Sequence, residues 1–292
     1  MGRSQKGWTV QGDYKITSDL LYADIRRWRR LMGMKQILVM MAAVVVVGCS
    51  KDTPETSQAV EAEAQVTPAP TPEPVSPVDQ KLIVEKAVRK SLKKPKGQLT
   101  EADLAKFTAI RNVTQITDTG LKEVAKLQQL TVLNLGSLKI TYVGLKEVAK
   151  LQNLKHLWLD NTRITDAGLM EIAKLQKLEG LSLEGTRITD AGLRELAKLQ
   201  NLKGLSLEDT RIADAGLKNV ARLENIQDLW LHNTSITDVG LKEVAKMKQL
   251  KSVSMFTVSG ALGTYGAETR ATFTRAGMAE LRKALPNCRF NP

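Results

Sequence analysis

The chain has 292 residues, of which 42% are hydrophobic, 25% are charged and only 4% are aromatic. This hydrophobic fraction can build a packed core and excludes a wholly disordered chain. Two cysteines exclude a disulfide-dense scaffold, and two histidines leave few options for a histidine-based metal site. The net charge of +12 suggests nucleic acid or an anionic membrane surface as a partner, provided that the charge is clustered.

The positive charge is spread over segments of different composition. Residues 1–48 have a net charge of +5, residues 49–79 of −5, residues 80–97 of +6 and residues 98–292 of +6. We therefore interpret the four segments as separate parts of the chain.

The first segment contains an apolar run of eleven residues, ILVMMAAVVVV, at positions 37–47. This run is too short to span a bilayer, which needs about 20 apolar residues. Basic residues such as Arg26 and Lys35 precede it, and Gly48-Cys49 ends it. A basic segment, a short apolar segment and a small-residue end predict a secretory signal over residues 1–48. A core strand or helix that ends in a cysteine is the alternative interpretation.

The ending Val46-Val47-Gly48-Cys49 resembles the lipobox of bacterial lipoproteins. The resemblance implies cleavage before Cys49 and acylation of Cys49, and two or more acyl chains give stable membrane anchoring. Ser50 follows in place of aspartate, which in that family favours the outer membrane. Residues 1–33 are then either an over-long start or, given Arg26-Arg27, part of a twin-arginine leader.

The next two segments predict a tether and a helix. Residues 49–79 are rich in proline, threonine and glutamate and cannot bury enough apolar surface to order themselves. Residues 80–97 predict a basic amphipathic helix that Asp79 can cap and Pro95 can stop. This helix either lies on anionic lipid or packs on the end of the following domain, and we favour the packing.

Residues 98–292 repeat with a period of 24 residues. Isoleucine recurs at this spacing at Ile116, Ile140, Ile164, Ile188, Ile212 and Ile236. One unit, from Leu154, reads LKHLWLDNTRITDAGLMEIAKLQN, and its pattern L-x-x-L-x-L-x-x-T-x-I-T-D-x-G-L resembles the leucine-rich repeat. The resemblance implies an α/β solenoid with parallel strands on a concave face and helices on a convex face.

Each unit also carries signals for its own packing. Six strands are expected, and the helix that follows each strand should pack one apolar face onto it. Thr165 or Asp166 can cap such a helix, and their equivalents repeat this. A column of threonines should bond backbone groups in the turns, which makes it structural: Thr162, Thr186, Thr210 and Thr234.

The ends of the repeat depart from its period, as capping units do. Leu99–Leu104 mimics the I-T-D-x-G-L phrase only 17 residues before Ile116, which predicts a shortened first unit. The last unit is delayed by an insertion at 257–272, whose G-x-x-G-x-x-G spacing is neither a P-loop nor a dinucleotide fingerprint. We expect a mobile rim loop there, and a buried structural thiol at Cys288.

Residues between the strand leucines should point out of the core and stack in three columns. The first column is Val132, His156, Gly180, Gly204, Asp228 and Ser252. The second column is Asn134, Trp158, Ser182, Ser206, Trp230 and Ser254. The third column is Gly136, Asp160, Glu184, Glu208, His232 and Phe256.

Ten members of these columns are the candidate ligand-binding residues: His156, Trp158, Asp160, Ser182, Glu184, Ser206, Glu208, Asp228, Trp230 and His232. We expect Trp158 and Trp230 to be exposed and about 14 Å apart, on either side of a low floor of glycine and serine. The carboxylates of the third column should form an acidic edge, offset by solvent, nearby arginines or a cationic partner.

Exposed tryptophans often anchor binding sites, so the columns favour non-enzymatic binding of a neutral or basic protein or peptide. Tryptophans beside small polar residues also suit a glycan such as a wall polymer. The alternative is that the two tryptophans arose by unit duplication and bind nothing. A metal held by His156 and Asp160, or by Glu208 and His232, lacks a full ligand set. No cofactor motif, carboxylate dyad or nucleophile–base pair is recognised, so we expect no enzyme, cofactor or metal.

The convex helices carry a basic column accompanied by glutamates three residues earlier, which is typical of a solvated helix face. With an export signal ahead of it, this mixed pattern argues against nucleic acid. The sequence therefore predicts a lipid-anchored binding protein of the cell envelope, held to membrane lipid through Cys49.

Overall fold

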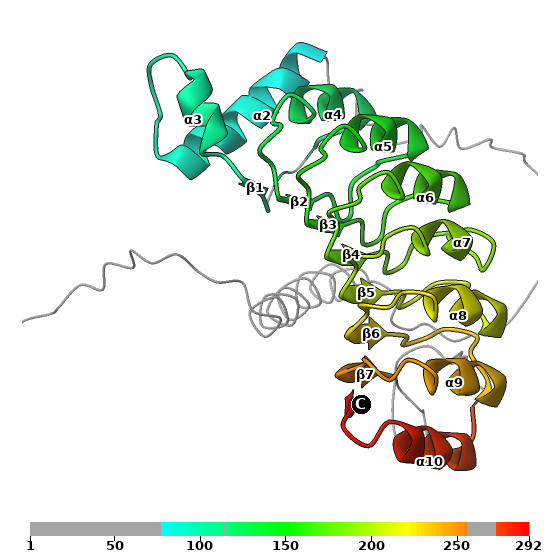
Figure 1. The fold of residues 1–292 in the computed structure, drawn as a ribbon. Helices are drawn as coiled ribbons and strands as arrows, with labels where there is room; N and C mark the ends of the chain where they lie inside the picture. The colour runs from blue at the N-terminus through cyan, green and yellow to red at the C-terminus, as the bar shows by residue number, and fades with distance from the viewer. Residues whose placement is uncertain (1–76, 112, 114, 256–272, 292) are drawn as a thin grey trace, which may run out of the picture. The chain divides into compact units, whose positions relative to one another are not determined.

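The computed structural model describes residues 77–111, 113, 115–255 and 273–291 (Figure 1). All of them belong to one compact unit, Pro70–Pro292. The predicted signal, Cys49, the tether as far as residue 76 and the insertion at 257–272 lie outside the described residues.

The described residues contain one parallel sheet of eight strands in chain order. The strands are β1 (Ala109–Ile110), β2 (Val132–Asn134), β3 (His156–Trp158), β4 (Gly180–Ser182), β5 (Gly204–Ser206), β6 (Asp228–Trp230), β7 (Ser252–Ser254) and β8 (Arg289–Asn291). The six expected strands are β2 to β7, while β1 and β8 come from the capping units. The expected α/β solenoid of parallel strands and helices is confirmed.

A helix precedes or follows each strand; α4 to α10 line one side of the sheet, and α2 and α3 lie at its β1 end (Figure 1). They are α2 (Pro77–Leu92), α3 (Glu101–Ala105), α4 (Asp118–Val124), α5 (Tyr142–Val148), α6 (Asp166–Ile172), α7 (Leu193–Leu196), α8 (Asp214–Val220), α9 (Asp238–Val244) and α10 (Arg275–Ala284). Within α6 and its turn, Leu169, Ile172, Ala173 and Leu175 are all buried, as the helical pattern predicts. Burying a leucine contributes about 2 kcal/mol, so stacked units supply the core that one unit lacks.

The threonine column is structural, as expected. Each hydroxyl is buried and donates to the backbone carbonyl three residues earlier: Thr162 to Leu159, Thr186 to Leu183, Thr210 to Leu207 and Thr234 to Leu231. The cap thiol also follows expectation, because Cys288 is buried and burial raises its pKa to about 11.

The aspartates that begin the helices accept hydrogen bonds from the next repeat unit. Asp214 accepts hydrogen bonds from the backbone N–H (2.8 Å) and hydroxyl (2.6 Å) of Thr237, which begins the next helix. We call this contact the inter-unit clasp. It recurs between Asp118 and Thr141, Asp166 and Thr189, and Asp238 and Thr274. Of the expected capping pairs, Thr237 caps its own helix by accepting from the N–H of Val239, whereas Thr165 makes no such bond. The aspartate carboxylates instead reach across to the neighbouring unit.

The clasp depends on a glycine in the next helix. A Cβ at Gly240 would lie 2.4 Å from Oδ1 of Asp214, so a larger residue would push the carboxylate away. Tyr142 replaces the aspartate in one unit, and Thr165 in the following unit makes no side-chain capping bond. The Tyr142 ring is half-exposed and lies 5.2 Å from the ammonium of Lys146.

The basic helix α2 packs against α4, which agrees with the packing interpretation. Val84 and Val88 are buried, and Gln80 is only 1% exposed. The Gln80 amide donates to the carbonyl of Gln115, and its oxygen accepts from the N–H of Thr117, so it takes the place of a clasp aspartate. The helix begins at Pro77, ahead of the Asp79 start expected from the sequence.

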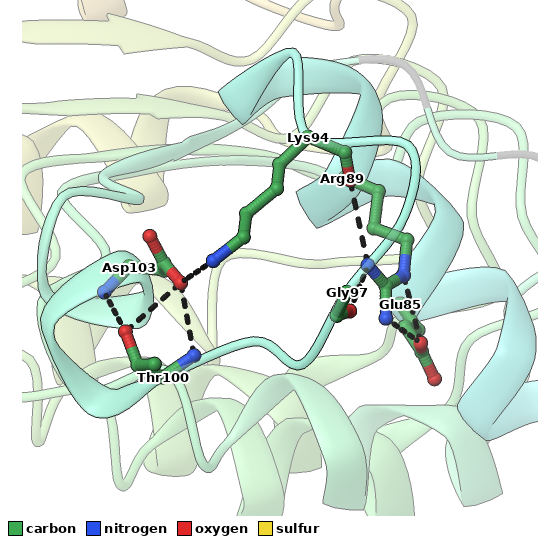
Figure 2. Close-up of polar contacts among 6 residues, drawn as sticks. All are labelled: Glu85, Arg89, Lys94, Gly97, Thr100 and Asp103. Atoms are coloured by element: carbon green, nitrogen blue, oxygen red, sulfur yellow. Dashed lines mark hydrogen bonds and ion pairs between the residues drawn. The ribbon is translucent and has the colours of Figure 1, made fainter.

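Polar contacts close the loop between α2 and α3 (Figure 2). Arg89 pairs with Glu85 and donates to the carbonyls of Lys94 and Gly97. The Lys94 ammonium contacts Asp103 at 2.6 Å, and Asp103 forms a capping box with Thr100. These donors hold the pKa of Asp103 well below its usual range.

The convex basic column is paired with glutamates. Five lysines each contact the glutamate three residues earlier at 2.6–2.7 Å: Lys126, Lys150, Lys174, Lys198 and Lys246. Surface pairs of this kind contribute at most about 1 kcal/mol each, so their main effect is to disperse the positive charge.

Two clasps differ by one hydrogen bond and provide a matched test. Asp214 accepts from the N–H and the hydroxyl of Thr237, whereas Asp190 accepts only from the N–H of Ala213. We expect Asp214→Ala to lower the free energy of unfolding by about 1–3 kcal/mol, and Asp190→Ala to cost about 1 kcal/mol less than that. Urea unfolding measures both, and equal losses would show that the Thr237 hydroxyl adds nothing.

Candidate functional site

The concave columns stack as the sequence predicts. Residue pairing aligns Val132, His156, Gly180, Gly204, Asp228 and Ser252 across neighbouring strands. The second column aligns Asn134, Trp158, Ser182, Ser206, Trp230 and Ser254 in the same register. The first two columns therefore form parallel rows across the sheet, each member one strand from the next.

Aromatic rings occupy this face on β3 and β6. The rings of His156 and Trp158 have centroids 6.0 Å apart and an interplanar angle of 23°. Trp158 and Trp230 are half-buried, so each exposes only part of its side chain on this face. The cause is packing against neighbouring side chains in the same face.

The expected low floor between the tryptophans is partly covered. A Cβ at Gly180 would lie 2.7 Å from Nδ1 of His156, so the histidine ring lies over this glycine. A Cβ at Gly204 would lie 3.7 Å from Cζ3 of Trp230, which places the indole over the second glycine. The glycines of β4 and β5 thus accept rings that lean inward from β3 and β6.

The acidic edge is smaller than expected. Glu208 is only 3% exposed, and its Oε1 lies 3.6 Å from Nε2 of His232. Asp160 accepts a hydrogen bond from the hydroxyl of Ser182. Glu184 remains half-buried at the end of β4. Asp160 therefore has a hydroxyl donor within the protein, and Glu208 is buried beside His232.

Ser254, His232 and Glu208 lie together but do not form a hydrolytic triad. The Ser254 hydroxyl is 2.7 Å from Nε2 of His232, the same nitrogen that faces Glu208. A triad needs the acid on the opposite ring nitrogen, where it orients the base. Ser254 is also only 6% exposed, which keeps a substrate away from its hydroxyl. Within the described ranges, no cluster of three or more His, Cys, Asp or Glu residues is placed to hold a metal ion.

Sequence reasoning missed a basic rim where the strands begin. Lys155, Lys177, Glu179, Asn201 and Lys203 line a hollow of about 240 Å³ there. Glu179 contacts the ammonium of Lys155 at 3.0 Å and that of Lys203 at 2.7 Å. These hydrogen bonds, that of Lys203 above all, lower the pKa of Glu179. The residue just before each strand carried the signal, as lysine at 155, 203 and 251.

The charges of this rim act on His156, a member of the first concave column. Burial lowers the pKa of His156, and the positive charges of Lys155, Arg111 and Lys203 lower it further, against an opposing effect of Glu179. The Nδ1 atom of His156 is buried and, among the described residues, has no hydrogen-bond partner. His156 therefore lies on the aromatic face within electrostatic reach of the rim lysines.

Residues 108–276 match the family model of the leucine-rich repeat region. No curated protein matches the chain. A leucine-rich repeat protein of Leptospira interrogans is 22% identical with a TM-score of 0.41, and the match covers 59% of this chain and 45% of that one. Internalin C2 of Listeria monocytogenes is 22% identical with a TM-score of 0.44, over 76% of this chain and 88% of its own.

The lowered pKa of His156 predicts acid sensitivity. An unfolded histidine binds a proton near pH 6.5, whereas the folded His156 binds one only at lower pH. Its contribution to stability is therefore retained above about pH 6.5 and is lost as the pH falls toward the folded-state pKa.

We expect His156→Gln to reduce the loss of unfolding free energy between about pH 7.5 and about pH 5. Urea unfolding of wild type and variant at the two pH values measures the effect, and His232 stays in both proteins as an internal constant. An identical pH dependence in the two proteins would show that His156 is not the acid-sensitive group.

Proposed function

We propose that this chain, which belongs to the leucine-rich repeat family, is a non-enzymatic protein that binds a protein or peptide partner through the concave face of its sheet. The observation that carries the proposal is the aromatic group on β3 and β6. Trp158 and Trp230 flank the small residues of β4 and β5 in one registered row.

The concave face is suited to binding because its parts are held in place before a ligand arrives. Each strand is hydrogen-bonded on both sides within the row, and the leucines beneath it are fully buried, as Leu157, Leu181 and Leu205 are. A rigid surface loses little conformational entropy on binding, which favours affinity. Half-buried tryptophan provides large apolar area together with an N–H donor, and this combination is frequent at interface anchors.

A non-catalytic role is supported by the polar groups of the same face. Ser254, His232 and Glu208 lack the arrangement of a nucleophile with an oriented base. The Ser182 hydroxyl donates to Asp160 of the preceding unit, so this contact fixes two surface side chains against each other. These contacts suit recognition of a ligand better than its chemical conversion.

A glycan is the second candidate ligand. Sugar rings stack on tryptophan, and Ser206 beside Trp230 provides a hydroxyl next to the aromatic surface. The half-buried state of both tryptophans leaves only part of each indole for such stacking, so we place the peptide first.

We further infer that the protein is anchored in the cell envelope, at the outer membrane, by acylation of Cys49. The motif that ends in Cys49 supports this, together with a proline-rich stretch long enough to separate the repeat domain from a membrane. None of the helices in the described part of the chain has the length and apolarity to cross a bilayer.

The tryptophans give the direct test of the binding face. We expect Trp158→Ala with Trp230→Ala to abolish capture of envelope protein by the full chain, with each anchor worth about 2 kcal/mol or more of binding free energy. Pull-downs from envelope protein extract and from purified wall polymer, run side by side, also separate a peptide from a glycan ligand.

The matched control is Met170→Ala, which removes an exposed apolar side chain from the convex helix α6. Circular dichroism should show all variants folded, because the tryptophan side chains lie above the core. Capture that is unaffected by loss of both tryptophans, or equally reduced by Met170→Ala, would refute the concave face as the binding surface.

The anchor has a separate test. Palmitate labelling of the expressed chain should be strong in wild type and absent in Cys49→Ala, because the thiol is the acylation site in the proposed lipobox. The control is Cys288→Ala, which removes the other cysteine and should label as wild type does. Equal labelling of Cys49→Ala and wild type would overturn the anchor.

A further inference from the structure

The hollow at the starts of β3, β4 and β5 lies beside the proposed binding face. We propose that this hollow is a subsite for a carboxylate of the bound peptide, either an acidic side chain or the C-terminus. The inference rests on the proposed function, and it adds an anionic group to a ligand that the sequence alone described as neutral or basic.

The geometry of Glu179 shows how a carboxylate is held at this place. Its two oxygens contact the ammoniums of Lys155 and Lys203, which approach from the units on either side. An ammonium has three N–H donors, and the contact with Glu179 uses one on each lysine. Both lysines are about half-exposed, so their remaining donors can reach a second carboxylate in the hollow.

The hollow lies where the repeat departs from its own pattern. Asparagines in the neighbouring loops donate across to the backbone of the preceding unit: Asn153 to Gln128, Asn201 to Gln176 and Asn225 to Gln200. Lys177 takes the asparagine position in the unit between the first two. Its ammonium donates to Oδ1 of Asn153 at 2.8 Å, so it adds a positive charge held next to the hollow.

The charge of the hollow favours an anion. Three lysines and one glutamate line it, which leaves a net charge of +2. Lysine ammoniums are compact point charges that suit a carboxylate of any orientation, so the hollow selects charge rather than a planar geometry. Glu179 is the opposing group, because it competes with an incoming carboxylate for the same ammoniums.

The hollow adjoins the aromatic face. Lys155, Glu179 and Lys203 directly precede the strand residues His156, Gly180 and Gly204. Two of these are the glycines over which the rings of His156 and Trp230 lie. The rim residues are adjacent in sequence to residues of the aromatic face. A peptide bound on that face can therefore place an acidic group in the hollow.

The experiment titrates small probes into the full-length, isotope-labelled chain and follows the backbone amide signals of Gly180 and Gly204 by NMR. An acetylated and amidated aspartate carries a side-chain carboxylate, and acetylglycine carries a terminal one. The corresponding acetylated and amidated asparagine is the neutral control. We expect saturable shifts with the carboxylates only, and the stronger of the two identifies the source of the group.

Two substitutions should change the affinity in opposite directions. Lys177→Asn restores the residue of the neighbouring units, so it should fold, and it should weaken carboxylate binding about two- to fivefold. Glu179→Gln removes the competing carboxylate and should strengthen binding by a similar factor. Lys174→Gln, which removes a charge from the convex face, should leave the affinity unchanged.

The result separates this inference from the proposed function. Small carboxylates need no tryptophan, so their binding should persist in Trp158→Ala with Trp230→Ala. Shifts that are the same for the carboxylates and the asparagine control, or affinities that do not change in Lys177→Asn and Glu179→Gln, overturn the subsite. If the subsite is overturned in this way but the tryptophan variant still loses protein capture, the proposed function holds and only the subsite is rejected.

Discussion

The in-register parallel pairing of the strands is the constraint on which the rest of the structure depends. From β2 to β7 each strand pairs with the next at the same repeat position, so one residue position becomes one row across the sheet. A shift of a single residue would exchange the buried leucines for the outward polar residues. The 24-residue period is therefore a physical requirement, because it keeps leucine on leucine in the core and aligns the outward residues into a surface.

The clasp aspartates and the buried threonines keep this register at the turns. A threonine hydroxyl satisfies a backbone carbonyl within its own unit, as Thr186 does for Leu183. A clasp aspartate fixes the next unit, as Asp166 does for Thr189. Both contacts lie between the end of a strand and the start of the following helix, where an unsatisfied buried group would cost about 1–3 kcal/mol.

The periodic features could be predicted from the sequence, and the contacts between non-identical neighbours could not. Strand positions, the threonine column and the concave rows follow from the period alone. The direction in which His156 leans depends on Gly180 in another unit, and the burial of Glu208 depends on His232 in the next. A clasp aspartate resembles an N-cap in sequence, because only the stacking of helices decides which backbone N–H lies within reach.

Function is expected where the units differ, since identical units need only pack. The differences concentrate on β3 to β6, with rings at Trp158 and Trp230, glycines between them and Lys177 at the adjoining rim. Residues that break the local pattern of a fold in this way are typical of binding sites. The convex lysines, each beside a glutamate, show the opposite behaviour and repeat almost without change.

The most direct measurement of the central claim is photo-crosslinking in cells that express the full chain. A photoreactive phenylalanine replaces Ser206 on the concave face, where the adjacent strand carries the large ring of Trp230 in the same row. A second chain carries it at Lys174 on the convex face. We expect a discrete crosslinked partner from Ser206 and none from Lys174. A partner captured from Lys174 alone, or equally from both positions, would contradict it.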